Sequence, residues 1–164
     1  LKINLKMIIP TLNKFKGLRF RNEIVINGKK IKVINDSKST SFSSTQELID
    51  TKKKTFWILG GLPKKGDKFT LSKKDCFNLR AYIFGKNAEF FAKRLKDKVH
   101  YQKFNNMISA IKKIKIDFKK EQMSNEKIIL FSPASASFDN FKNFEERGRY
   151  FNSQLRKIGI NGKK

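Results

Sequence analysis

The sequence predicts an α/β fold in which helices cover a mostly parallel sheet. Short apolar runs, typical of buried strands, recur at 55–59, 79–84 and 128–131. Segments with the spacing or composition of helices separate these runs, and such alternation is typical of parallel sheets. An Asn27-Gly28 pair joins two alternating apolar runs, 23–26 and 30–34, and predicts a hairpin in front of the parallel part.

The expected helices and one further strand complete this arrangement. Helices are expected over residues 1–16, 44–50, 68–77, 87–98 and 104–119, with a short strand at 99–102. The most regular apolar spacing in a helix is at Phe104, Met107, Ile108, Ile111, Ile114 and Phe118. The sequence therefore predicts a Rossmann-like sheet with helices on both faces and an N-terminal β-hairpin.

A last helix is expected after the strand at 128–131. Ser137 or Asp139 could cap it. Its apolar positions on one face are Phe141, Phe144, Phe151 and Leu155. Gly148 shares that face and would let the helix approach the sheet closely.

Length and composition indicate one globular domain. The 164 residues are 38% hydrophobic and include 16 phenylalanines, enough for a real core. No apolar run reaches the roughly 18 residues of a membrane span, so no membrane partner is expected. The single cysteine, Cys76, excludes an internal disulfide and favours a reducing compartment, hence the cytoplasm. The first residue is Leu1 instead of methionine, which suggests a fragment of a longer protein.

The formal net charge of +24 has two interpretations. Thirty-eight Lys and Arg against 14 acidic residues could indicate a nucleic-acid partner. An AT-rich coding sequence would also give abundant Lys, Ile, Asn and Phe without such a partner. The aromatic residues lie mostly on apolar faces and are not interleaved with lysine as a stacking platform, so no nucleic acid is expected. The charge would still favour anionic ligands.

Polar loops follow three of the strands, at 36–40, 60–64 and 132–138. Carboxyl ends of parallel strands lie at one edge of a sheet, where open α/β sheets bind ligands. The acid, lysine and hydroxyls of Asp36-Ser37-Lys38-Ser39-Thr40 suit a nucleotide phosphate. The second loop is not a P-loop, because Asp67 follows Gly66 where lysine is required. His100 is the only histidine and has no cysteine near it, so no metal site or catalytic dyad is predicted.

Residues 132–148, S-P-A-S-A-S-F-D-N-F-K-N-F-E-E-R-G, resemble the signature near the end of the D-glutamate-adding Mur ligases, the UDP-N-acetylmuramoyl-L-alanine:D-glutamate ligases of peptidoglycan synthesis. The loop at 36–40 is similar to the D-S-K-x-T segment of this family, and the loop at 60–64 to its Gly-Gly-x-x-Lys turn. Residues 17–21 resemble a Gly-Leu-Pro-His-Arg-type turn, although Arg19 and Phe20 replace its proline and histidine. Ser41 replaces a usual asparagine.

The resemblance implies two groups of binding residues. The nucleotide group is Arg21, Asp36 and Lys38, with Asp36 at the ribose and Lys38 at the terminal phosphate. The D-glutamate group is Thr40, Lys64, Ser137, Phe138 and Phe144. Without the resemblance, Arg21 and Lys64 are more typical of solvated surface charges, and Phe144 is as typical of a core-facing aromatic.

The resemblance also implies a reaction and a domain arrangement. The family uses ATP and Mg²⁺ to join D-glutamate to UDP-N-acetylmuramoyl-L-alanine through an acyl phosphate. Residues 1–16 would be the tail of a preceding central ATPase domain with a linker, and 17–164 the C-terminal, amino-acid-binding domain of a monomeric ligase. The sequence has no P-loop or magnesium-binding acids, so the chain alone is expected to be inactive. The rival interpretations are a basic nucleic-acid-binding module, or a glutamate- or nucleotide-binding module without catalysis.

Overall fold

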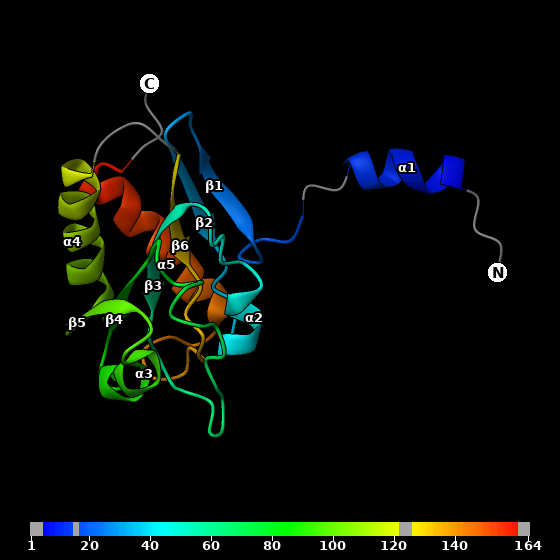
Figure 1. Ribbon diagram of the computed structural model, residues 1–164. Coiled ribbons are helices and arrows are strands. Elements are labelled where there is room, and N and C mark those ends of the chain that lie inside the picture. Colours follow the sequence, from blue (N-terminus) through cyan, green and yellow to red (C-terminus); the bar gives the residue numbers. More distant parts are fainter. Residues whose placement is uncertain (1–4, 15–16, 122–125, 161–164) are drawn as a thin grey trace.

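The computed structural model describes residues 5–14, 17–121 and 126–160, and in this part of the chain six strands form one sheet (Figure 1). The strand order is β1-β2-β6-β3-β4-β5. The strands are β1 Glu23–Asn27, β2 Ile31–Asn35, β3 Lys54–Leu59, β4 Leu79–Phe84, β5 His100–Phe104 and β6 Lys127–Phe131. Only β1 is antiparallel to its neighbour, since the other four pairings are parallel. The predicted hairpin and mostly parallel sheet are confirmed.

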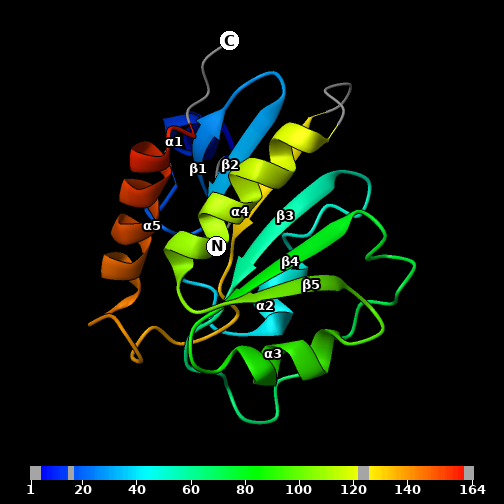
Figure 2. The ribbon, with the colours of Figure 1, turned by 90° about the vertical axis from the view of Figure 1, so that its left-hand side faces the viewer.

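Helices cover both faces of the sheet, as predicted (Figure 2). They are α1 Leu5–Lys14, α2 Phe42–Gln46, α3 Ala88–Leu95, α4 Met107–Lys120 and α5 Phe144–Ile158. α4 and α5 pack on one face, and α2 and α3 on the other. Helix α1 stands apart from the sheet (Figure 1). None of the helices in the described ranges has the length and hydropathy that crossing a membrane requires.

The central strand β3 shows how the sequence builds two cores from one sheet. Phe56 and Ile58 pack against the α4 and α5 side, whereas Trp57 and Leu59 pack against the α2 and α3 side. Successive side chains of a strand point to opposite faces, so a strand covered on both faces is apolar throughout.

The structure contradicts the helix predicted at 68–77, where residues 73–78 form turns. The Gln46 side chain accepts hydrogen bonds from the backbone amides of Thr70 and Leu71. Lys98 Nζ donates to the carbonyl of Phe69 at 3.1 Å. These side chains satisfy backbone groups that a helix would have paired internally, so tertiary contacts replace the helix.

The cap predicted for the last helix is also wrong. α5 begins at Phe144, and its N-cap is Asn143, whose Oδ1 accepts from Glu146 N at 2.8 Å. Ser137 instead begins a turn, with its carbonyl accepting from Phe141 N at 3.0 Å. Phe141 therefore precedes the helix. Gly148 permits a close approach to the sheet as expected, since its carbonyl accepts from Asn35 Nδ2, at the end of β2, at 3.0 Å. It also leaves room for Phe20, because an added Cβ would lie 2.4 Å from that ring.

Candidate functional site

The three motif loops meet at one edge of the sheet, because β2, β6 and β3 are adjacent and parallel. The loop after β2 joins β6 through Asp36 N, which donates to Phe131 O at 2.7 Å. The loops after β3 and β6 are joined by a pair of backbone hydrogen bonds of 3.0 and 2.9 Å between Leu62 and Ala136. The predicted convergence of the three loops is confirmed.

Arg147, on α5, joins two of these loops from inside the protein. Its guanidinium is fully buried and lies between the loop after β2 and the loop after β6. On the first loop it donates to the Ser37 carbonyl at 2.7 Å and to the Ser37 hydroxyl at 3.1 Å. On the second it donates to the carbonyls of Ser135 and Ala136 at 2.9 and 3.1 Å, and to the Ser135 hydroxyl at 3.3 Å. One side chain therefore sets the spacing of the two loops.

All five of these hydrogen bonds go to carbonyl or hydroxyl oxygens, and none goes to a carboxylate. Burial lowers the pKa of Arg147 to about 10, while the negative charges of Asp139 and Asp36 act in the opposite direction. The side chain is therefore still a cation at neutral pH, and it contributes positive charge beneath the site.

The loop after β3 requires glycine at position 61. Gly61 has φ +136°, which side chains rarely adopt. A Cβ there would lie 2.4 Å from Ser135 Oγ and 2.7 Å from the Ala136 carbonyl. The loop carrying Lys64 can approach the loop after β6 only because this position has no side chain.

Two of the predicted nucleotide-binding residues have defined environments. Asp36 is buried, with Oδ1 accepting from Asn22 N at 3.1 Å and Oδ2 accepting from Ser132 Oγ at 3.0 Å. Burial raises the pKa of Asp36, and these hydrogen bonds and the charges of Arg21 and Arg147 oppose that rise. Arg21 itself is exposed.

Lys38 and Phe144 come from different motifs and from the two different predicted ligand groups. The Lys38 ammonium nevertheless lies 4.2 Å from the centroid of the Phe144 ring. Phe144 is the first residue of α5 and is half-buried. This cation–π contact therefore joins a residue predicted to bind the nucleotide to a residue predicted to bind D-glutamate.

The other predicted D-glutamate residues lie on the same loops, with different exposure. Ser137 is buried, directly after the two residues that Arg147 binds. Phe138 is 71% exposed, so its ring is free to meet a ligand. Thr40 and Lys64 are exposed on the loops after β2 and β3. The structure thus brings four of the predicted residues close to the two loops that Arg147 joins, namely Asp36, Lys38, Ser137 and Phe144. It leaves Arg21, Thr40, Lys64 and Phe138 at the surface.

Sequence reasoning missed Arg147 and Ser132, although both lie within the quoted signature. A signal for Arg147 was available, because it falls four residues before Phe151 on the apolar face of α5. A charged residue at such a position requires polar partners in the interior. No group of three or more His, Cys, Asp and Glu residues suited to a metal ion occurs in the described ranges.

Comparison with solved structures defines the class of fold. The chain matches UDP-N-acetylmuramate-alanine ligase MurC of Thermotoga maritima with a TM-score of 0.54 and 16% identity, over 94% of this chain and 34% of that one. It matches the MurF ligase of the same organism, solved with ADP, with a TM-score of 0.50 and 17% identity, over 92% of this chain and 36% of that one. The fold is that of a Mur ligase domain.

Comparison with curated sequences shows which ligases the chain resembles. The chain is 36% identical over 159 residues to UDP-N-acetylmuramoylalanine–D-glutamate ligase of the Wolbachia of Brugia malayi, and 38% identical over 152 residues to that of Wolbachia pipientis wMel. It is 34% identical over 153 residues to that of Francisella philomiragia. No family model matches the sequence. Over almost its whole length the chain is similar to one segment of UDP-N-acetylmuramoylalanine–D-glutamate ligases. These alignments include 91 to 96% of this chain but only 29 to 36% of the length of the relatives.

Proposed function

We propose that this chain is the C-terminal, amino-acid-binding domain of an ATP-dependent ligase that adds D-glutamate to UDP-N-acetylmuramoyl-L-alanine in peptidoglycan synthesis. Residues 17–164 would form this domain, and residues 1–16 the tail of a central ATPase domain with its linker. The observation that carries the proposal is the junction of the three motif loops at one sheet edge, where Arg147 holds two of them together.

In this proposal the loop after β2 serves the nucleotide. The Asp36 carboxylate, fixed by Asn22 and Ser132, would accept hydrogen bonds from the ribose hydroxyls. Lys38 would leave the Phe144 ring to pair with the terminal phosphate, and the exposed Arg21 lies near Asp36 to add positive charge. The described residues do not form a metal site, so Mg²⁺ would be held by another part of the ligase and by the nucleotide phosphates.

The loop after β6 and the start of α5 would hold D-glutamate. Ser137 and Phe138 would lie beside its carboxylate, with Phe144 as one wall. Lys64 would pair with the side-chain carboxylate, and Thr40 would donate a hydroxyl hydrogen bond.

In the proposed reaction, ATP first phosphorylates the carboxylate of UDP-N-acetylmuramoyl-L-alanine and leaves as ADP. The D-glutamate amine then attacks the acyl carbon, so a C–N bond forms, a C–O bond breaks, phosphate departs and the amine loses a proton. This domain would supply orientation to that attack.

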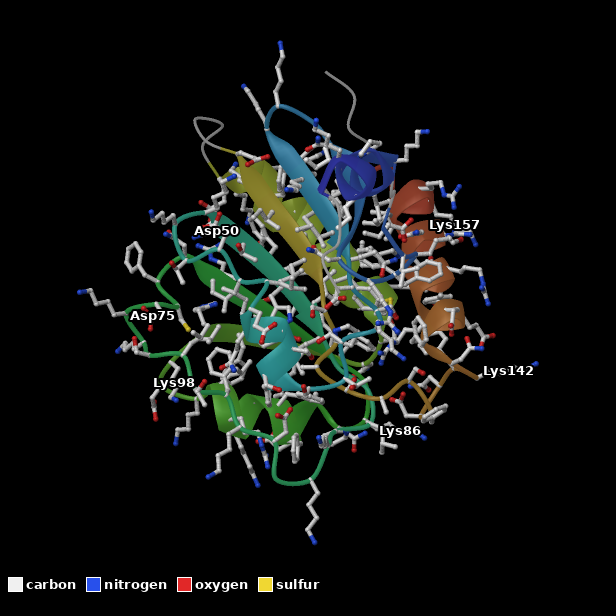
Figure 3. All side chains as sticks on the ribbon, turned by 90° about the vertical axis from the view of Figure 1, so that its right-hand side faces the viewer. Asp50, Asp75, Lys86, Lys98, Lys142 and Lys157 are labelled. Carbon is white, nitrogen blue, oxygen red and sulfur yellow. The ribbon has the colours of Figure 1, made fainter. Side chains whose placement is uncertain are left out.

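A cytoplasmic, monomeric ligase without a nucleic-acid partner fits this proposal. The ligase substrates are anionic, so the net charge of +24 would favour their approach. The lysines labelled in Figure 3 (Lys86, Lys98, Lys142 and Lys157) come from separate parts of the chain and do not follow a single helix or strand. These four lysines therefore do not mark a groove of the kind that tracks a nucleic-acid backbone.

The test is an amide NMR titration of this chain with D-glutamate and, separately, with L-glutamate. We expect D-glutamate to shift the amides of Gly61, Ser137 and Phe138, and L-glutamate to act more weakly. Lys64→Ala should reduce the response, whereas Lys65→Ala, its exposed neighbour, should not. No response to either enantiomer, or equal responses, would contradict the assignment of the pocket.

The chain alone should release no ADP from ATP with both substrates present, and measurable release would contradict the prediction that it is inactive.

A further inference from the structure

Ser132 is the first residue after β6, and the strands around it fix its position. Its side chain is fully buried. Its amide donates to the Ile58 carbonyl at 3.3 Å, and its carbonyl accepts from Trp57 Nε1 at 2.7 Å. Both partners belong to β3, at the centre of the sheet. The hydroxyl of Ser132 is therefore held on a rigid part of the fold, opposite the end of β2.

A chain of hydroxyls passes through Ser132 to Asp36. Ser132 Oγ donates to Asp36 Oδ2 at 3.0 Å and lies 2.8 Å from Thr45 Oγ1. Thr45 Oγ1 lies 2.8 Å from Ser39 Oγ, which lies 2.8 Å from Ser44 Oγ. The chain thus runs from the predicted ribose-binding carboxylate to the first turn of α2, beside the exposed Thr40.

The ionised carboxylate of Asp36 fixes which hydroxyl donates and which accepts in each of these hydrogen bonds. A hydroxyl has one proton to donate, and an ionised carboxylate can only accept. Because the Ser132 hydroxyl donates its hydrogen bond to Asp36, it can only accept from Thr45, so Thr45 donates to Ser132 and Ser39 donates to Thr45. Ser132 and Thr45 are then each used both as donor and as acceptor, while Ser44 Oγ donates to the Ser41 carbonyl at 2.9 Å. A hydroxyl that both donates and accepts is held in one orientation.

Few other groups act on the Asp36 carboxylate. The backbone amide of Asn22 occupies Oδ1 at 3.1 Å, and the cations that act on it are Arg21 and Arg147. Arg147 donates its hydrogen bonds to Ser37, Ser135 and Ala136, so it provides no direct bond to Asp36. Ser132 is therefore the only side chain among the described residues that donates a hydrogen bond to this carboxylate.

We propose that Ser132 is a positioning residue that fixes the orientation of Asp36 and keeps it ionised, with Thr45 and Ser39 orienting the Ser132 hydroxyl. The consequence for nucleotide binding rests on the proposed function, because it requires Asp36 to bind the ribose. The effect of Ser132 on Asp36 itself does not. A hydrogen bond to the ionised form stabilises that form, so its loss makes Asp36 easier to protonate.

The experiment follows the Asp36 side-chain carboxyl ¹³C shift against pH in this chain, without ligands. We expect the titration midpoint to move to higher pH in Ser132→Ala, and to a smaller extent in Ser132→Cys, which retains a weak donor. Thr45→Val is the matched control, because it removes a buried hydroxyl that only orients Ser132 and leaves the Ser132 donor to Asp36 in place. Its midpoint should move much less than that of Ser132→Ala. Equal shifts in Ser132→Ala and Thr45→Val would show a general structural effect and overturn the proposal, as would no shift in Ser132→Ala.

The wild-type chain gives a second, independent measurement that needs no substitution. A hydrogen-bonded, buried Ser132 hydroxyl proton should exchange slowly with water. It should also show a coupling to the Asp36 carboxyl ¹³C across the hydrogen bond to Oδ2. A rapidly exchanging hydroxyl would overturn the proposal even if the variants did not fold. In a complete ligase that contains this domain, Ser132→Ala should raise the KM for ATP about tenfold and leave the KM for D-glutamate unchanged. If the titration behaves as expected and the KM for ATP does not change, Ser132 positions Asp36 but the nucleotide role of Asp36 is wrong.

Discussion

The Lys38 ammonium lies 4.2 Å from the centroid of the Phe144 ring and so connects the loop after β2 with the first turn of α5. Phe144→Leu keeps apolar bulk but removes the ring. We expect weaker D-glutamate binding in the NMR titration and a loss of no more than about 1 kcal/mol in the free energy of unfolding. Phe90→Leu is a matched control, because Arg94 lies over Phe90 at 3.3 Å on the separate helix α3. Equal effects of both substitutions on glutamate binding would contradict a role for Phe144 in the pocket.

Arg147→Met should destabilise the domain strongly. The substitution leaves the carbonyls of Ser37, Ser135 and Ala136 without this donor in the interior, and each such loss costs about 1 to 3 kcal/mol. We expect the free energy of unfolding in urea to fall by at least about 3 kcal/mol. Arg149→Met changes an exposed arginine on the same helix and should cost less than about 0.5 kcal/mol. A small effect of Arg147→Met on the free energy of unfolding would show that the Arg147 hydrogen bonds do not hold the two loops together.

Gly61→Ala should be far more costly than Gly66→Ala. The new Cβ at position 61 would overlap Ser135 Oγ and the Ala136 carbonyl at a φ of +136°, so we expect a loss of about 3 kcal/mol. Gly66 has φ +80° but open space around it, so only the backbone cost of about 1 kcal/mol applies. Thermal unfolding of both variants measures the difference. Similar melting temperatures would mean that the two loops are not in the close contact described.

Cys76 should make the domain less stable as the pH rises from about 9 to about 11. Burial raises the pKa of its thiol from 9.0 to about 11. In that interval the unfolded chain has lost a proton that the folded chain retains, so the folded state loses stability as the pH increases. The measurement is urea unfolding of the wild type and of Cys76→Ala at several pH values. The difference between their free energies of unfolding should narrow as the pH rises from about 9 to about 11. Parallel pH profiles would contradict the raised pKa.

Much of the fold followed from apolar runs and turn residues, because those signals are local. The strand predicted at 79–84 is β4 as observed, and β3 and β6 differ by one residue at their starts. The hairpin was recognised from Asn27-Gly28. The helix predicted at 68–77 failed because the groups that bind its backbone, Gln46 and Lys98, are distant in sequence.

The site was predictable in its loops but not in its internal support. Asp36, Lys38 and Ser137 could be found because their motifs follow strands. The bond between Asp36 and Ser132 joins residues 96 positions apart, and those between Arg147 and Ser37 join residues 110 apart. Such contacts depend on the order of the strands in the sheet, which short motifs do not contain. The Asn143 cap was a local signal, since Glu146 follows it three residues later, but the predicted cap was Ser137 or Asp139.

The most direct measurement is ATP turnover by a hybrid ligase. Residues 17–164 would replace the corresponding segment of the Wolbachia relative that is 36% identical to this chain. A second hybrid, carrying the segment of the Francisella relative, controls for the joining of different sequences. We expect ADP release that requires D-glutamate, is weaker with L-glutamate, and falls at least about tenfold with Lys38→Ala. A folded hybrid that releases no ADP with D-glutamate, while the Francisella hybrid is active, would contradict the assignment of this chain as the amino-acid-binding domain.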